Sequence, residues 1–360
     1  MKPSAPLLLS TLFGAVCGLH AQEATSGFDL RTTITGQGVY SPELTEPPRS
    51  GGAFLGGARV LLYPTWKLNN HWTITASLQA YTRPFFESQF SVQGYGVTTD
   101  VLQASLNYTR FWNRASINVR VGQLSSTFGS FLLRYDDAVN PLPGIPEGYG
   151  YYAPISPLGL AGAEINATAG RFDGRAQFVN SSPANPRGIT QPDQYGTWAG
   201  GAGYTIRQGF RVGGSTYYGP YLDRQYPYYF PGEEEPRKLP ATALGLDVQF
   251  ALGPWNVYGE WQHFRMDYTV IPTFTEQTGY GELRRVLNPR WFLAARIEYV
   301  RSNSFTGYQR YEVGAGYRPN RLQLAKISYG IEQGPGQGAI SGVLTVQFVT
   351  SLDLFSAARH

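Results

Sequence analysis

The sequence predicts an all-β fold, a transmembrane antiparallel up-and-down β-barrel of about sixteen strands. The first observation is that tight and long connections alternate along the chain, as they must where every second turn lies on the same rim of a barrel. The second is composition: 15% of the residues are charged and 14% are aromatic, including 25 tyrosines. Few charges and many aromatics are typical of a lipid-facing wall with aromatic girdles at both membrane surfaces.

The predicted strands show period-two alternation and are mostly about ten residues long, the length that a tilted strand needs to cross the hydrocarbon layer. In segment 71–83, for example, Trp72 and Ile74 face one way, and Thr73 and Thr75 the other. The strands are predicted at 28–40, 52–63, 71–83, 100–112, 114–123, 160–171, 174–180, 196–207, 209–218, 240–252, 254–264, 276–287, 290–301, 309–318, 321–331 and 340–355.

The order of the turns favours a membrane barrel over a soluble sandwich, whose strands would alternate in the same way. Tight turns follow only even-numbered strands, whereas a sandwich would mix turn lengths at both ends. They lie at Asn69-Asn70, Asn113, Asp173-Gly174, Gln208, Gly253-Pro254, Asn288-Pro289 and Pro319-Asn320. Aromatic residues beside these turns predict an interfacial girdle: Trp66, Trp72, Phe111, Trp112, Trp255 and Trp291.

Residues 1–21 resemble a signal peptide, with Lys2 at the start, a broken apolar stretch to Val16 and Ala21 at the cut. A lipoprotein signal around Cys17 is the less favoured alternative. Cleavage would leave residues 22–360 as one barrel domain without cysteine, and hence without disulfides or thiolate metal ligands. The net charge of +4 gives no indication of a nucleic-acid partner. No cofactor or metal site is predicted.

The longest predicted connection is residues 124–159, between the fifth and sixth strands. Loops of this length are usually functional or disordered, and its wealth of aromatics, proline and glycine argues against disorder. We expect it to fold into the barrel, where Phe128, Phe131, Leu132 and Leu133 would pack. The alternative is a cap over the outer edge. The other long connections are predicted at 41–51, 84–99, 181–195, 219–239, 265–275, 302–308 and 332–339.

Charged side chains of both signs are predicted to face the lumen, where water would keep them hydrated and their field would act on passing solutes. Six of the strand and loop positions are predicted to set selectivity: Arg120, Arg134, Asp136, Asp137, Glu164 and Arg175. The remaining lumen-lining positions are Arg59, Arg211, Asp247, Glu260, Arg296, Glu298, Arg310, Arg318 and Glu312. In the alternative interpretation, many of these groups pair across strands and hold the wall together.

The sequence does not present the residue arrangement of an enzyme. A hydrolase would need a serine–histidine pair with a third residue to orient the base, and no serine can be placed beside His263. The run Glu233-Glu234-Glu235 could bind a divalent cation that bridges lipopolysaccharide phosphates. A solvated loop tip is the more usual state of such a run. Outer-membrane lipids and lipopolysaccharide are therefore predicted neighbours.

A stripe of small residues marks the outer face of the sixth strand: Ala161, Ala163, Ala167 and Ala169. A neighbouring subunit could pack there, which would make a homotrimer, but lipid also tolerates alanine.

Two short motifs carry a family resemblance. The run Val119-Arg120-Val121-Gly122-Gln123-Leu124, followed by Thr127-Phe128-Gly129, resembles the exit of the fifth strand in phosphate-selective (O/P-type) porins. The stretch 179–186, Val-Asn-Ser-Ser-Pro-Ala-Asn-Pro, is similar to the loop after the seventh strand in that family. The whole pattern resembles sixteen-stranded bacterial outer-membrane porins. This resemblance implies a pore with a folded-in third loop. The chain has only four lysines and mixes Glu with Arg in the lumen, so its preferred ion stays open.

We therefore expect a passive outer-membrane channel for small hydrophilic solutes or ions, not an enzyme, with both termini in the periplasm. The alternative is a barrel whose third loop fills the lumen and whose outer loops have a structural, adhesive or binding role.

Overall fold

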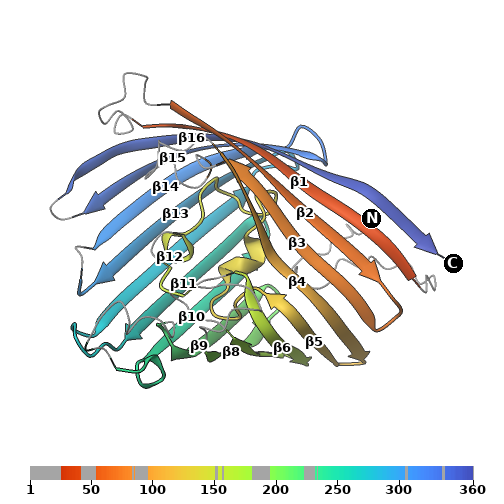
Figure 1. The fold of residues 1–360 in the computed structure, drawn as a ribbon. Coiled ribbons are helices and arrows are strands. Elements are labelled where there is room, and N and C mark those ends of the chain that lie inside the picture. The colour runs from red at the N-terminus through yellow and green to blue at the C-terminus, as the bar shows by residue number, and fades with distance from the viewer. Residues whose placement is uncertain are drawn as a thin grey trace.

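The computed structural model describes residues 26–41, 54–82, 85, 96–150, 153–155, 158–180, 195–222, 232, 234–304, 307–334 and 337–359. Its strands form one closed barrel in which every neighbouring pair is antiparallel (Figure 1). No helix in this part of the chain is long and apolar enough to span a membrane. The predicted signal peptide, 1–21, lies outside the described residues.

The strands follow the predicted order and mostly begin and end within a few residues of the predicted bounds. They are β1 (Ser26–Tyr40), β2 (Phe54–Lys67), β3 (Trp72–Thr82), β4 (Val97–Trp112), β5 (Ala115–Leu124), β6 (Leu160–Ala169), β7 (Phe172–Asn180), β8 (Gly196–Arg207), β9 (Phe210–Pro220), β10 (Pro240–Leu252), β11 (Trp255–Met266), β12 (Phe274–Val286), β13 (Trp291–Ser302), β14 (Tyr308–Tyr317), β15 (Gln323–Gly334) and β16 (Gln337–Arg359). Two differences concern β16. It continues past the predicted end at 355, and its pairing of Gln337 with Gly334 makes the predicted long connection at 332–339 short.

The barrel closes where β1 pairs with β16. Their register runs from Ser26 opposite Arg359 to Tyr40 opposite Leu344, with one bulge at Leu30/Arg31. The residues after Phe355 therefore belong to the wall, and Ser356 Oγ donates to Asp29 Oδ1 at 2.6 Å. Closure leaves no free sheet edge, which is the condition for an antiparallel sheet to span a bilayer.

Side chains on each strand alternate between the interior and the exterior of the barrel. On β12, Glu276, Thr278 and Glu282 are buried, while Gln277 and Leu283 are exposed. Large apolar side chains are exposed on the outer wall: Leu244, Leu246, Leu293, Ile297, Val313, Ile327 and Val346. The predicted girdle residues are exposed beside the short turns: Trp66, Trp72, Phe111, Trp112, Trp255 and Trp291.

Glycines bring β4, β5, β6 and β7 together at the point where the long loop leaves the wall. Gly122 has φ +140°, and an added Cβ would lie 2.2 Å from the carbonyl oxygen of Ala104. Its register partner Gly162 would place a Cβ 2.1 Å from the oxygen of Phe178. Only glycine fits such close backbone approaches. The close approach of the backbones therefore explains why the motif at 119–124 has a glycine at position 122.

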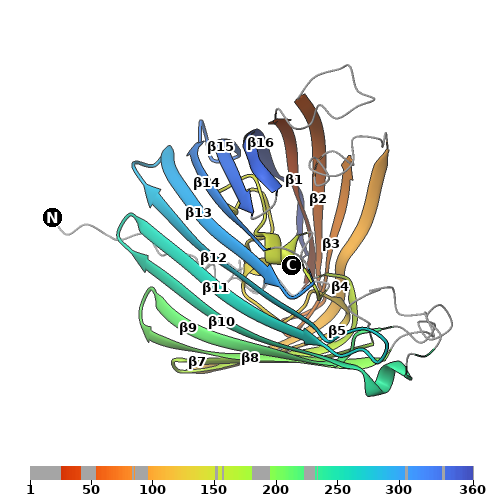
Figure 2. The ribbon, with the colours of Figure 1, turned by 90° about the vertical axis from the view of Figure 1, so that its left-hand side faces the viewer.

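The loop between β5 and β6 lies inside the barrel (Figure 2). Two short 3₁₀ helices form in it, η3 (Phe131–Arg134) and η4 (Glu147–Tyr149). Loop residues Phe131 and Tyr149 pack with Leu61 of β2 and Tyr280 of β12 in one buried cluster. The expectation for Leu133 was wrong: it is 39% exposed, because the turn of η3 directs its neighbours on both sides to the wall instead.

Candidate functional site

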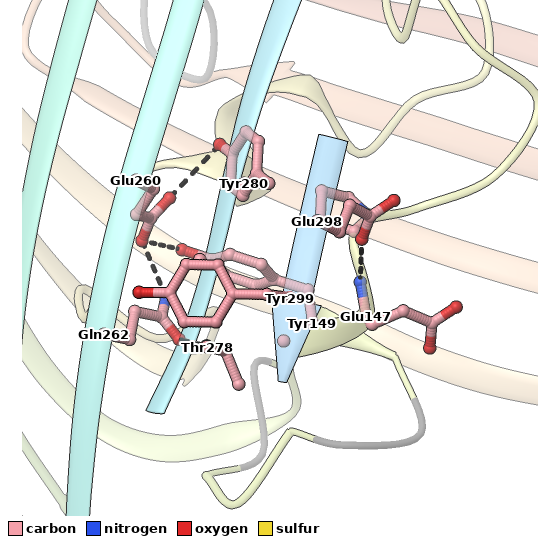
Figure 3. Close-up of a pocket in the computed structure, with 11 residues that line it drawn as sticks. Glu147, Tyr149, Glu260, Gln262, Thr278, Tyr280, Glu298 and Tyr299 are labelled. Atoms are coloured by element: carbon pink, nitrogen blue, oxygen red, sulfur yellow. Dashed lines mark hydrogen bonds between the residues drawn. The ribbon is translucent and has the colours of Figure 1, made fainter. Parts of the chain in front are cut away.

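Glu260 of β11 fixes the first part of the loop. Its carboxylate accepts hydrogen bonds from the backbone N–H and hydroxyl of Ser130, at 3.2 and 2.9 Å, and from the hydroxyls of Tyr149 and Tyr280 (Figure 3). Gln262 donates to it as well. Burial raises the pKa of Tyr149 well above its usual range and the Glu260 charge raises it further, so this phenol keeps its proton and donates.

A network of arginines and glutamates on β12, β13 and β14 fixes the second part. Arg296, fully buried, makes ion pairs with Glu282 at 3.4 Å, Glu298 at 2.8 Å and Glu312 at 2.8 Å. Loop residues complete the network. Arg134 pairs with Glu282. Arg310 pairs with loop residue Glu147 at 2.6 Å, and the Glu147 N–H donates to Glu298 at 2.7 Å (Figure 3).

Two aspartates attach the loop to the opposite wall. Asp136 accepts from Tyr63 of β2 at 2.7 Å and from Thr33 of β1 at 3.1 Å. Asp137 accepts from Thr35 of β1 at 2.8 Å and pairs with Arg59 of β2 at 3.4 Å. Hydrogen bonds therefore connect the loop to both sides of the barrel.

Arg318, directly after β14, donates to the carbonyl oxygen of loop residue Ala138 at 3.2 Å. The other predicted lumen residues lie on the inner faces of β5–β10. Arg120 pairs with Glu164 at 3.4 Å. Arg211 pairs with Asp173 at 2.6 Å and Asp247 at 2.7 Å. Arg175 instead donates to the carbonyl oxygen of loop residue Gly129 at 2.6 Å and is partly exposed.

All the predicted site residues lie inside the barrel, but the expectation that water hydrates them is wrong for most. Arg59, Arg296 and Glu298 are at most 2% exposed. A buried charge is costly unless it is paired, and these groups are paired. Some pairs cross between strands, as in the alternative interpretation, whereas Arg59–Asp137, Arg134–Glu282 and Arg310–Glu147 join the wall to the loop.

Several anchoring residues were absent from the sequence prediction. Glu282, which binds Arg134 and Arg296, is the inward position between Tyr280 and Arg284 on β12, so period-two alternation contained the signal. Lys326 of β15 donates to the backbone oxygens of Asp137 and Asn140, at 2.8 and 3.1 Å. Backbone acceptors in a loop leave no signal in a sequence.

Two other predicted features lie apart from this site. His263 stacks on Trp261, with ring centroids 6.2 Å apart, and its Nδ1 has no hydrogen-bond partner in the described part of the chain. In the charged run, Glu234 pairs with Lys238 at 3.5 Å and Glu235 with Arg237 at 3.7 Å, all exposed. Glu233 lies outside the described residues.

The fold is shared with solved outer-membrane proteins. The anion-selective porin from Comamonas acidovorans matches with TM-score 0.61 at 10% identity, covering 91% of this chain and all of that one. OmpF of Salmonella typhi, solved with daunomycin, matches with TM-score 0.60 at 12% identity, covering 91% and 98%. The fold is that of an outer-membrane porin. The trimer form of OmpT from Vibrio cholerae matches with TM-score 0.58 at 11% identity, covering 91% and 100%.

No family model and no curated protein matches the sequence. At these identities the likeness to porins concerns the fold, while solute, selectivity and assembly have to be argued from this chain's own residues. The resemblance to the O/P-type family stays a prediction.

Proposed function

We propose that the protein is an outer-membrane porin, a passive channel for small hydrophilic solutes or ions that is constricted by the loop between β5 and β6. The observation that carries the proposal is the loop's attachment inside a closed sixteen-stranded barrel through Glu260, Glu282, Asp136 and Asp137. A loop fixed at both sides of a lumen reduces its cross-section. In this proposal selectivity depends on Arg120, Arg134, Asp136, Asp137, Glu164 and Arg175.

The proposal includes an orientation and a set of neighbours. The rim of short turns and both termini face the periplasm, the exposed apolar wall contacts lipid, and the long loops meet lipopolysaccharide. A homotrimer would use the outer face of β6, where Ala163, Ala167 and Ala169 are exposed and Ala161 is buried. No catalytic step belongs to the proposal.

Planar-bilayer recording of the purified protein tests channel function. We expect stable ohmic conductance steps, whose size falls when the solution contains polyethylene glycols small enough to enter the pore. Absence of steps from folded, inserted protein would contradict the proposal.

Arg175 offers a test of selectivity, because it is partly exposed and its guanidinium donates to a backbone oxygen, that of Gly129, instead of pairing with a carboxylate of the described residues. Arg175→Gln should move the reversal potential in a salt gradient toward cation preference, since one lumen cation is lost. Arg171→Gln removes the same charge at a short turn, where Arg171 donates to the oxygen of Ile206, and should leave the potential unchanged. Equal shifts in both variants would contradict a role of Arg175 in the pathway.

One observation favours a second candidate, in which the loop fills the lumen and the protein has a structural or binding role. The loop bonds to strands on many sides of the barrel: β1, β2, β7, β9, β11, β12, β13, β14 and β15. Bilayer recording distinguishes the two candidates. The Glu282→Gln variant weakens the attachment of Arg134. If this variant shows conductance steps and the unmodified protein shows none, the second candidate is correct.

A further inference from the structure

Exposed arginines follow the rim of short turns, from the end of β4 to the turn before β13. We call them the arginine collar: Arg110, Arg114, Arg171, Arg207, Arg285 and Arg290. None of them makes an ion pair with a described residue. At these turns, residues 110–114, 169–173, 205–211, 252–256 and 285–291, the sequence has one acidic residue, Asp173, which pairs with Arg211 at 2.6 Å. This part of the rim therefore has a positive charge that no carboxylate of the turns balances.

Three arginines of the collar lie over aromatic rings of the outer wall. The distances from the guanidinium carbon to the ring centre are 5.3 Å for Arg110 over Trp112, 4.8 Å for Arg285 over Trp255 and 6.0 Å for Arg207 over Phe250. Each of these arginines lies within two residues of the end of its strand. Both tryptophans belong to the interfacial girdle, so the guanidinium groups lie at the level of lipid headgroups.

The aromatic contact leaves the hydrogen-bond donors of these arginines available. A ring covers one face of a guanidinium group, whereas the five N–H donors lie in its plane. No described residue accepts a hydrogen bond from the side chains of Arg110, Arg207 or Arg285. Two neighbouring donors of a guanidinium group fit two oxygens of one phosphate. The collar therefore presents several phosphate-binding groups on the outside of the barrel.

The exposed cations near the opposite rim have a different environment. Three of those that the structure describes pair with carboxylates: Arg237 with Glu235 at 3.7 Å, Lys238 with Glu234 at 3.5 Å and Arg265 with Asp267 at 3.1 Å. Arg301, which lies over Tyr299, is an exception. Unpaired positive charge is thus concentrated at the short turns.

We infer that the arginine collar binds anionic phospholipids of the leaflet that surrounds the short turns, through the phosphates of their headgroups. A zwitterionic headgroup has its own cation beside the phosphate, whereas an anionic headgroup supplies the net negative charge that the collar lacks. The apolar wall continues up to the collar, since Leu252 and its register partner Trp255 are both exposed. One lipid molecule can therefore place its chains on the wall and its phosphate on an arginine. The inference rests on the proposed membrane placement and adds the class of lipid.

Tryptophan fluorescence tests this preference, because most of the seven tryptophans lie beside short turns. The full-length protein is reconstituted in phosphatidylcholine vesicles that contain increasing amounts of brominated phosphatidylglycerol or, for comparison, brominated phosphatidylcholine. Bromine quenches tryptophan on contact. We expect phosphatidylglycerol to bind roughly threefold or more tightly than phosphatidylcholine, since several cations act together. Equal quenching by the two lipids would overturn the inference.

A matched pair of triple variants locates the preference. Replacing Arg110, Arg207 and Arg285 by glutamine should bring the two lipids close to equal binding. Replacing Arg237, Lys238 and Arg265 by glutamine removes the same charge from the opposite rim and should leave the preference unchanged. Equal loss in both triple variants would indicate an effect of net charge and would overturn a site at the collar.

The unmodified protein provides a further test that does not depend on the variants folding. The preference for phosphatidylglycerol should disappear in about 1 M NaCl, where charges are screened beyond about 3 Å. A preference that persists there would contradict binding by the collar. Failure of the inference differs from failure of the channel. Equal quenching with conductance steps contradicts the collar alone, a lipid preference without steps contradicts the channel alone, and no quenching by either lipid contradicts the membrane placement on which both rest.

Discussion

Glu260 illustrates how a single residue holds the loop, because its buried carboxylate accepts hydrogen bonds from donors on the loop and on the wall. In Glu260→Ala, Ser130, Tyr149 and Tyr280 lose an acceptor, and each buried donor left unsatisfied costs about 1–3 kcal/mol. We expect a lower thermal midpoint and noisier, larger conductance. Heat-induced unfolding in detergent and bilayer recording measure both effects.

The control for this variant is Glu235→Ala, which removes a carboxylate from an exposed pair with Arg237. Exposed pairs contribute about 0–1 kcal/mol, so its midpoint should stay close to that of the unmodified protein. If both variants lower the midpoint equally, Glu260 has no special role.

Arg296 is the central cation of the network on β12–β14. Arg296→Met leaves Glu282, Glu298 and Glu312 without it, and breaking such a buried pair costs about 3–5 kcal/mol. Arg296→Lys should rescue little, because an ammonium group cannot reach three carboxylates with separate planar donors. Chemical unfolding should show a large loss of unfolding free energy for Arg296→Met and for Arg296→Lys. Arg301→Met changes an exposed residue of the same strand and should show almost no loss.

At the scale of elements, Gly122 and Gly162 control how β5 and β6 fit between β4 and β7. Gly122→Ala places a methyl group against the oxygen of Ala104, in a backbone conformation that favours glycine, and Gly162→Ala meets the oxygen of Phe178. Both should lower the yield of folded barrel, measured by its resistance to denaturation on electrophoresis. Gly174→Ala, which meets nothing within 4 Å, should fold normally.

The strands were largely predictable from the sequence, because a wall with lipid outside imposes alternation on every segment. β8 and β10, for example, have the predicted bounds. For the loop, the sequence predicted that it folds into the barrel but not which residues attach it there. Arg134 and Glu282 are 148 positions apart. Alternation on β12 turns Glu282 inward, and Arg134 belongs to the loop that was expected to fold inward, but neither pattern indicates that these two residues meet.

At the scale of the whole molecule, the exterior should behave as a lipid-facing belt whose tolerance of charge depends on depth. On β10, Leu246 lies mid-strand and Leu252 ends the strand at a short turn, and both are exposed. In lipid vesicles, Leu246→Arg should lower the free energy of unfolding by about 2–4 kcal/mol, while Leu252→Arg should lower it by about 0–1 kcal/mol. Reversible unfolding in vesicles measures the difference; equal costs would contradict the predicted membrane placement.

The pairing of β1 with β16 also has a consequence for biogenesis. These two strands are the most distant in sequence, so no partially synthesised chain can complete the cylinder, and all earlier hairpins wait with an unsatisfied edge. Such long-range pairing makes folding slow and leaves intermediates prone to aggregation. The cylinder therefore cannot close before β16 is available, and we expect any incomplete barrel to need protection of its open edge until then.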